Sequence, residues 1–192
     1  MFRLEQLSTI TRRPRITRPP YCAGTSYGEN LVKQGLSAGI GKLMSLQVAF
    51  KTGSHSGYPT DDSLHSWVAC GANVSSTGDD QFYWYQVASC ACGNRKEQSA
   101  LEECAKGVPA AAVAPVRACM ADTARAQTLT SAMHKYADSF KDYPWVIVDG
   151  DDKAVPEPDT HGDKVEPLLA KVCERAQQAH AWPASDLPAA CA

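Results

Sequence analysis

Apolar residues recur at helical spacing from about Glu29 to Lys42, which predicts a helix in this segment. Glycines inside the segment weaken that helix, because each costs about 1 kcal/mol relative to alanine. Apolar and polar residues then alternate over residues 45–50, which indicates a strand with one buried face. A polar loop rich in Gly, Ser, Asp and Thr follows over residues 51–63.

The middle of the chain has a mixed pattern. Residues 64–80 favour neither helix nor strand clearly. The aromatic run Phe82–Ala88 has strong strand propensity, although the same residues can also begin a helix. Three further helices are predicted after it, at residues 97–106, 110–120 and 123–140.

The C-terminal part predicts a strand, a loop and a helix. The short apolar run Trp145–Val148, bounded by Pro144 and by a turn, is typical of a buried strand. An acidic loop with prolines follows over residues 151–163. Apolar residues from Val165 to Ala176 fall at i, i+3, i+4, i+7, i+8 and i+11, which predicts an amphipathic terminal helix.

This order of elements favours an α/β fold, because a parallel strand is reached through a crossover connection of this kind. A chain of 192 residues is long enough for one domain with its own core. We divide it into a basic arm over residues 1–20, a domain over residues 21–182 and a tail over residues 183–192 that Cys191 can pin.

Charge excludes two classes of partner. The formal net charge of −2 gives no field that would attract nucleic acid or an anionic membrane. No apolar run approaches about 18 residues, so we expect no stable membrane insertion. The basic arm carries five arginines against one acidic residue, and it lacks the apolar stretch of a secretory signal. It resembles a transit peptide or a truncated start, and we expect residues 1–20 to lie outside the fold.

Eight cysteines spread over the whole chain change this picture. Such spacing fits a disulfide framework in an oxidising compartment better than a zinc site, which needs clustered ligands. The sequence leaves the pairing open.

The spacing of the later cysteines and the run Y-P-W-V-I-V-D-G from Tyr143 to Gly150 together resemble the gamma-interferon-inducible lysosomal thiol reductase family. The resemblance covers about residues 21–191. It implies a thioredoxin-like fold, in which helices flank a mixed central sheet and a helical insertion carries disulfides. It also implies reduction of protein disulfides in an acidic compartment. The cysteines that carry the resemblance are Cys90, Cys104, Cys119, Cys173 and Cys191.

A degenerate copy of the family signature C-Q-H-G-x-x-E-C-x-x-N begins at Ser63. His65, Cys70 and Asn73 keep their spacing in this signature loop. We expect a structural role for His65, because a satisfied loop histidine is more common than a catalytic one. The departures from the family pattern are Ser63, Ser66 and Ala69.

The family's catalytic C-x-x-C corresponds to the run from Cys22 to Thr25. An attacking thiol must be a thiolate, and the N–H groups at a helix start lower its pKa. Thr25 replaces the second cysteine, which would release the reduced substrate. We therefore expect Cys22 to act as a monothiol or weakened nucleophile, resolved by an external thiol or by another cysteine. The alternative is that Cys22 is a structural half-cystine.

Pro144 corresponds to the thioredoxin-fold proline that faces the active-site cysteine. The resemblance implies a cis peptide bond between Tyr143 and Pro144, with Tyr143, Pro144 and Trp145 binding an extended substrate. The alternative is a trans proline that starts a strand.

The remaining cysteines are expected to be structural. We pair Cys90 with Cys104, leave Cys92 as an odd thiol, and expect Cys119 and Cys173 to close other disulfides. A zinc site built on Cys90 and Cys92 with His65 or His134 is a weaker alternative, because no second cysteine pair accompanies them.

Two further features carry less weight. The triplet Asn73-Val74-Ser75 is a glycosylation sequon, which makes Asn73 a candidate acceptor if the chain is secreted. The cluster from Tyr83 to Tyr85 is more typical of a core than of a binding site.

Together these features predict a thiol oxidoreductase that acts on protein or peptide disulfides through Cys22, is regenerated by a thiol reductant, and needs no cofactor or metal. By family resemblance we expect a secretory or lysosomal compartment. The alternative function is that of an inactive, disulfide-stapled thioredoxin-like binding domain.

Overall fold

The structure is a computed structural model of the whole chain, and it describes residues 7–8, 25–44, 46, 48–52, 61–74, 80–94, 96–139, 145–146, 165–178 and 187–191. For residues 7–8, 25–29, 61 and 145–146 it describes the backbone alone. Helices dominate these residues. They are α1 (Thr25–Ala38), α2 (Asp61–Val74), α3 (Asp80–Gly93), α4 (Ala100–Ala105), α5 (Ala110–Ala121), α6 (Thr123–Ala137) and α7 (Glu166–Gln178), with 3-10 helices η1 (Ile40–Leu43) and η3 (Ala189–Cys191).

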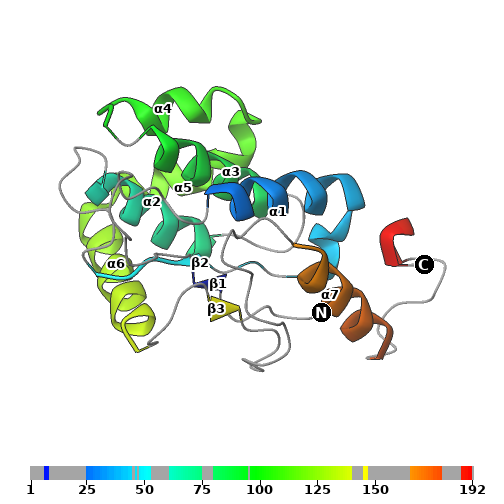
Figure 1. The fold of residues 1–192 in the computed structure, drawn as a ribbon. Coiled ribbons are helices and arrows are strands. Elements are labelled where there is room, and N and C mark those ends of the chain that lie inside the picture. The colour runs from blue at the N-terminus through cyan, green and yellow to red at the C-terminus, as the bar shows by residue number, and fades with distance from the viewer. Residues whose placement is uncertain are drawn as a thin grey trace, which may run out of the picture.

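Three strands of two residues each form a small sheet in the order β2-β1-β3. These strands are β1 (Leu7–Ser8), β2 (Val48–Ala49) and β3 (Trp145–Val146). β1 runs parallel to β2 and antiparallel to β3. Leu7 and Ser8 belong to the basic arm, so this part of the arm belongs to the sheet, in contrast to the expectation that residues 1–20 lie outside the fold. Figure 1 shows the helices α1 to α5 gathered on one side of this sheet.

The predicted thioredoxin-like α/β fold with a mixed central sheet is wrong for this structure. Helices form most of the described residues. Among them, the predicted strand segments 45–50 and 145–148 contribute the two-residue strands β2 and β3. The helical, disulfide-bearing segment that was expected as an insertion is the main body of the described structure (Figure 1).

The aromatic run Phe82–Ala88, for which the sequence left strand and helix open, lies in α3, the central helix. α3 packs against α1, α2, α4 and α5, so its side chains are covered on several faces. Its buried residues include Phe82, Trp84 and Tyr85, whereas Tyr83 is half-buried, so two of the three residues of the predicted aromatic cluster lie in the core. A helix that is apolar all round is stable only when it is buried in this way, and such burial outweighs strand propensity.

A buried glutamine fixes the start of α3. Gln81 is fully buried, and its Nε2 donates to the carbonyl oxygens of Gly41 at 2.9 Å and Met44 at 2.8 Å. Its Oε1 accepts a hydrogen bond from the backbone N–H of Leu46. Each polar atom of the amide therefore has a partner, which offsets the cost of its burial. The segment that follows α1 is held against the first turn of α3.

Two glycines have roles in this packing. Gly39 has a φ of +65°, and this left-handed conformation ends α1 four residues earlier than the sequence pattern predicted, at Ala38. Gly35 lies against the ring of Phe82, where an added Cβ would stand 2.8 Å from two ring atoms. The close approach of α1 to α3 therefore depends on a residue without a side chain.

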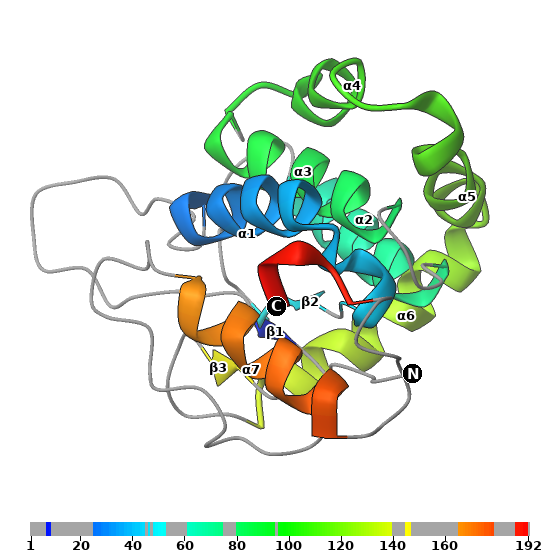
Figure 2. The same ribbon diagram turned by 90° about the vertical axis from the view of Figure 1, so that its right-hand side faces the viewer.

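The terminal helix matches its prediction. In α7 the residues Leu168, Val172 and Ala176 are buried, as the amphipathic pattern requires. Gln34 of α1 donates to the carboxylate of Glu166 at 3.1 Å, which ties α7 to α1. Figure 2 shows α7 and η3 on the same side of the molecule.

Candidate functional site

The three signature residues lie on α2, not in a loop, and each bonds to the segment formed by α5 and α6. His65 contacts His134, Cys70 is joined to Cys119, and Asn73 contacts Arg125. These residues lie five and three positions apart on α2, so the contacts follow one side of the helix over more than two turns. The signature therefore cross-links α2 to α5 and α6.

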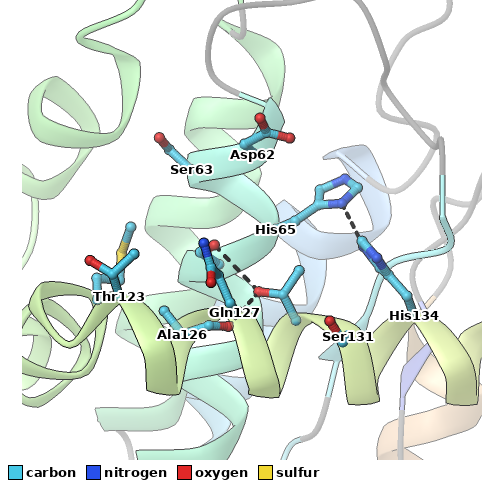
Figure 3. Close-up of a pocket in the computed structure, with 11 residues that line it drawn as sticks. Asp62, Ser63, His65, Thr123, Ala126, Gln127, Ser131 and His134 are labelled. Carbon is cyan, nitrogen blue, oxygen red and sulfur yellow. Dashed lines mark hydrogen bonds between the residues drawn. The ribbon is translucent and has the colours of Figure 1, made fainter.

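His65 and His134 form a hydrogen-bonded pair at one end of this contact. His65 Nδ1 lies 2.8 Å from His134 Nε2, and the two rings meet edge to face with centroids 5.0 Å apart. His65 is 6% exposed and its ring also packs on Phe50. Figure 3 shows the two imidazoles pointing toward one another from α2 and α6. Such a bond requires one ring nitrogen to donate and the other to accept, so it does not survive protonation of both rings.

Burial lowers the pKa of His134 below its ordinary value of 6.5, and the carboxylate of Asp138, one turn further along α6, opposes this by raising it. Desolvation is the larger effect, so His134 stays neutral at pH values where an exposed histidine would begin to gain a proton. A neutral His134 supplies the acceptor or donor that the pair needs.

A pocket of about 600 Å³ opens beside the pair, between α2 and α6 (Figure 3). Hydroxyl and amide side chains line most of it. Thr130 Oγ1 lies 3.3 Å from Ser66 Oγ across the floor. We call this the histidine pocket, and its lining residues are Asp62, Ser63, His65, Ser66, Met120, Thr123, Ala126, Gln127, Thr130, Ser131 and His134.

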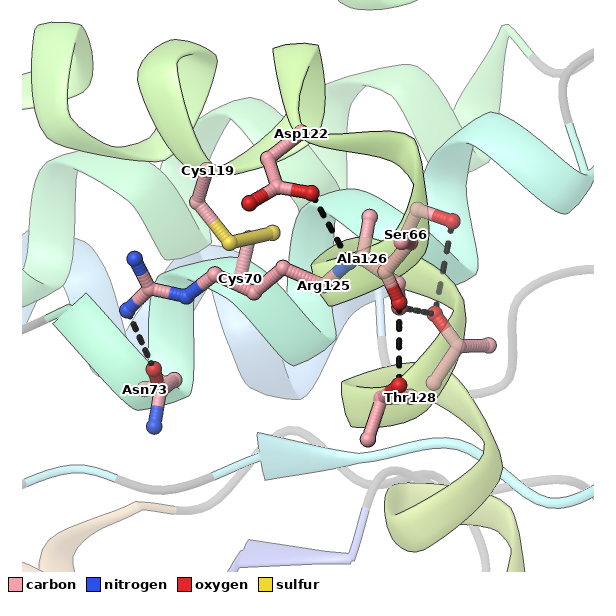
Figure 4. The surroundings of a disulfide bond; sticks show 10 residues. Ser66, Cys70, Asn73, Cys119, Asp122, Arg125, Ala126 and Thr128 are labelled. Carbon is pink, nitrogen blue, oxygen red and sulfur yellow. Dashed lines mark hydrogen bonds between the residues drawn. A yellow bond between two sulfur atoms is a disulfide. The ribbon is translucent and has the colours of Figure 1, made fainter.

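The disulfide between Cys70 and Cys119 closes the other end of the contact. Cys70 is fully buried and Cys119 is 2% exposed. At the corner between α5 and α6, the Asp122 carboxylate accepts a hydrogen bond of 3.0 Å from the backbone N–H of Arg125, which caps α6. The guanidinium of Arg125 reaches back to Asn73 Oδ1 at 3.0 Å (Figure 4).

The structure contains two further disulfides among the described residues. Cys90 is joined to Cys104, which is the pairing proposed from the sequence, and Cys173 is joined to Cys191, which pins the tail to α7. Cys92 is also disulfide-bonded, so the expectation of an odd thiol at Cys92 is wrong. Three intramolecular disulfides are consistent with an oxidising compartment.

These bonds also remove the zinc alternative. Zinc binds cysteine as thiolate, and Cys90 and Cys92 both have their sulfur in a disulfide. Within the described ranges, no group of three His, Cys, Asp or Glu side chains comes together.

Several predicted site residues fall outside the described residues, namely Cys22, Tyr143 and Pro144. Of Thr25 and Trp145 only the backbone is described, with Thr25 as the first residue of α1 and Trp145 in β3. Their roles in catalysis and substrate binding stay predictions. Asn73, the glycosylation candidate, is exposed in the last turn of α2.

The sequence analysis missed several residues that build this region. Gln81 belongs to no sequence motif. Its role is seen only from the hydrogen bonds that its buried amide makes in the structure. His134, Thr130 and Ala126 lie four residues apart, which places them on one face of α6. The sequence does not show that this face packs against α2 and lines the histidine pocket.

The geometry offers two kinds of chemistry. The histidine pocket offers hydroxyl, amide and imidazole groups that can bind a polar ligand. The cysteines can exchange thiols and disulfides wherever one pair can be reached by a thiol. No helix of the described part of the chain has the length and apolar character to cross a membrane. Comparison of the chain with protein families, with curated proteins and with solved structures gives no match.

Proposed function

We propose that this protein is a thiol oxidoreductase that acts on protein or peptide disulfides through the thiolate of Cys22. The observation that supports it best is the start of α1 at Thr25, the last residue of the Cys22–Thr25 run. A thiol just before a helix start gains from the partial positive charge of the unpaired N–H groups, which stabilises the thiolate. The resemblance of the sequence to a thiol reductase family agrees with this.

The first chemical step is nucleophilic attack. The Cys22 thiolate attacks one sulfur of the substrate disulfide, the substrate S–S bond breaks, and the second substrate sulfur leaves as a thiolate that takes a proton from water. The product is a mixed disulfide between Cys22 and the substrate. A thiol reductant attacks it, releases the reduced substrate, and returns Cys22 to its thiol form. Thr25 serves this step by donating a hydrogen bond to the Cys22 thiolate.

The compartment belongs to the same proposal. A thiol reductase held by disulfides of its own suits a secretory or lysosomal setting. Asn73 would then carry a glycan, and its exposed position at the end of α2 leaves room for one. Secretion from a eukaryotic host should give a mass shift that an amide-cleaving glycosidase removes and that Ser75→Ala prevents. A protein secreted without the shift contradicts glycosylation at Asn73.

The experiment that tests the function is reduction of a fluorogenic peptide disulfide by the purified protein in the presence of a thiol. Cys22→Ser should abolish the reduction, since serine is not a useful nucleophile toward sulfur. The matched control is Cys90→Ser with Cys104→Ser, which removes a described disulfide and should leave the chemistry at Cys22 intact. Reduction by Cys22→Ser at the parent rate contradicts the proposal.

A second candidate function is that of a disulfide-stapled binding domain without turnover, and the histidine pocket is the observation that favours it. Thr25→Cys separates the two. It creates a C-x-x-C pair and should raise turnover if Cys22 is a nucleophile, whereas an unchanged background rate in both Thr25→Cys and Cys22→Ser favours the binding domain.

A further inference from the structure

The histidine pocket carries polar groups that the proposed thiol chemistry does not use. Its hydroxyl side chains come from α2 and from α6, and they are Ser63, Ser66, Thr123, Thr130 and Ser131. Its volume of about 600 Å³ falls within the range of roughly 300–1,000 Å³ that is usual for small-molecule sites. The pocket is therefore large enough to hold a small organic molecule.

Several of these groups are available to a ligand. Among the described residues, the side chains of Ser63, Gln127 and Ser131 have no hydrogen-bond partner, and all three residues are exposed. Figure 3 shows Gln127 reaching from α6 toward α2, with Ser63 on the first turn of α2. A ligand with well-placed polar groups can replace the water that such side chains bind in solution.

The floor of the pocket is held in place by protein contacts. Thr130 Oγ1 donates to the backbone carbonyl oxygen of Ala126 at 2.8 Å and lies 3.3 Å from Ser66 Oγ. His65 and His134 are hydrogen-bonded to one another beside it. Because these side chains are already ordered, a ligand that binds them does not have to order them itself, which lowers the entropy cost of binding.

The charge of the lining limits the class of ligand. The described residues that line the pocket include no lysine or arginine, and Asp62 adds a carboxylate. Burial lowers the pKa of His134, so at neutral pH this imidazole carries no positive charge. An anionic ligand would meet the charge of Asp62 with no cation in the lining to offset the repulsion.

The hydroxyl-rich lining matches a ligand that is itself rich in hydroxyl groups. A hydroxyl both donates and accepts hydrogen bonds, so the two sets of hydroxyls can pair in either direction. Met120 and Ala126 add an apolar part to the lining, which suits the C–H groups of a sugar ring. We propose that the histidine pocket binds a neutral sugar. The inference rests on the pocket and not on the chemistry at Cys22, and it supplies a ligand class for the second candidate function.

The first measurement is a titration of the purified, isotope-labelled protein with glucose, mannose and galactose, followed by the NMR signals of the backbone N–H groups. No thiol is added, so the result is independent of the reduction assay. At least one sugar should bind with a dissociation constant of about 1–10 mM, the affinity expected of a small ligand that replaces water. The shifts should gather at Ser66, Gln127 and Thr130. Three sugars without saturable shifts at these residues overturn the inference and leave the function proposed at Cys22 standing.

Charged forms of the sugar that binds best test the charge argument at nearly constant shape. Its uronate should bind about fivefold more weakly, the factor that repulsion between two carboxylates about 4 Å apart gives in water. Asp62→Asn should reduce this difference between the two sugars. A uronate that binds as tightly as the neutral sugar contradicts the proposal, and so does an amino sugar that binds about tenfold more tightly, since that would indicate a site for cations.

A neutral peptide is the competing ligand. The probe is N-acetyl-alanine methylamide, which carries two backbone amides and no hydroxyl group. It should bind more weakly than the best sugar, because the amide N–H groups only donate and the carbonyl oxygens only accept. Tighter binding of this probe than of every sugar would overturn the proposal in favour of a peptide site.

Two threonines of α6 give a matched pair of variants. Thr130 and Thr128 each donate from Oγ1 to the carbonyl oxygen four residues earlier, at 2.8 and 2.9 Å, but of the two only Thr130 lines the pocket. Thr130→Val should weaken binding of the best sugar by about threefold to tenfold, as expected for the loss of one hydrogen bond. Thr128→Val loses the same kind of backbone contact and should bind the sugar as the parent does.

Melting temperatures of both variants control for folding. Gln127→Ala repeats the test at an exposed position, so the result does not depend on the folding of Thr130→Val. It should also weaken binding of the sugar by about threefold to tenfold. Parent affinity in both Thr130→Val and Gln127→Ala, or an equal loss in Thr128→Val, overturns the assignment of the sugar to this pocket.

Discussion

The contact of α2 with α5 and α6 differs from the contact of α1 with α3 in how it is held. The first is polar and covalently closed, with a histidine pair, an arginine–asparagine hydrogen bond and a fully buried disulfide. The second is an apolar approach that depends on Gly35 and on the buried amide of Gln81. The signature residues thus hold α2 to α5 and α6, and we call this the locked contact. The thiol chemistry that we propose belongs to the start of α1, and the packing of α1 on α3 would be disturbed by a single methyl group added at Gly35.

The largest expected effect comes from opening the locked contact. Cys70→Ser with Cys119→Ser removes a bridge between residues 49 positions apart. By the loop-entropy relation this should cost about 4 kcal/mol of unfolding free energy. Reduction through Cys22 should persist at temperatures where the variant is folded. Chemical denaturation measures the loss of stability, and the fluorogenic assay measures the reduction of substrate. Loss of activity in fully folded variant protein would indicate that the chemistry takes place at the Cys70–Cys119 disulfide instead.

Gly35→Ala should disturb the other contact. The added Cβ meets the Phe82 ring at 2.8 Å, and overpacking of this kind costs about 1–3 kcal/mol. Because α1 then shifts on α3, the reduction that we propose at Cys22 should slow as well. Gly93→Ala is the matched control, since a Cβ there meets nothing within 4 Å. If Gly35→Ala lowers stability without changing the thiol chemistry, the two contacts do not differ in the way described.

His134→Gln tests the pH dependence of the locked contact. The folded-state pKa of His134 is lowered, so the unfolded chain binds more protons over the acid range. The stability that this group contributes above its ordinary pKa of 6.5 is therefore lost as pH falls from that value through the lowered folded-state pKa. The wild type should lose stability toward acid, and the variant should lose less. At neutral pH the substitution should cost about 1 kcal/mol for the altered hydrogen bond. Melting temperatures across the acid range, with Lys135→Gln as the control on the same turn, measure this, and parallel curves would contradict it.

The smallest effect is expected at the cap of α6. Asp122→Ala removes the acceptor for the backbone N–H of Arg125 and should cost about 1 kcal/mol. Asp122→Asn keeps an acceptor oxygen and should cost little. Thermal unfolding of the two variants compares them directly, and an equal loss in both would indicate that the charge of Asp122 matters more than its hydrogen bond.

The spacing of apolar residues along the sequence predicted helices well where one apolar face of the helix is buried. The terminal helix, with Leu168, Val172 and Ala176 inward, follows from spacing alone, and so do the helices at residues 110–120 and 123–140 within a few positions. It did not decide between helix and strand at Phe82–Ala88, because a run that is apolar on every side shows neither the helical nor the strand repeat of apolar residues. Packing against neighbouring helices decides the secondary structure there. It also gave the sheet too large a place in the fold: the described part of the chain is mostly helical, and its strands need partners that lie far away in the chain.

For the candidate site, the sequence by itself determined the inventory: eight cysteines, the spacing of His65, Cys70 and Asn73, and a lone cysteine before a helix start. Tertiary structure alone decided the partners. The choice of Cys119 for Cys70, of His134 for His65 and of Arg125 for Asn73 depends on how α2 lies along α6, which no local interaction encodes. Disulfides and hydrogen bonds act over a few ångströms in space, whereas sequence spacing reports only distance along the chain.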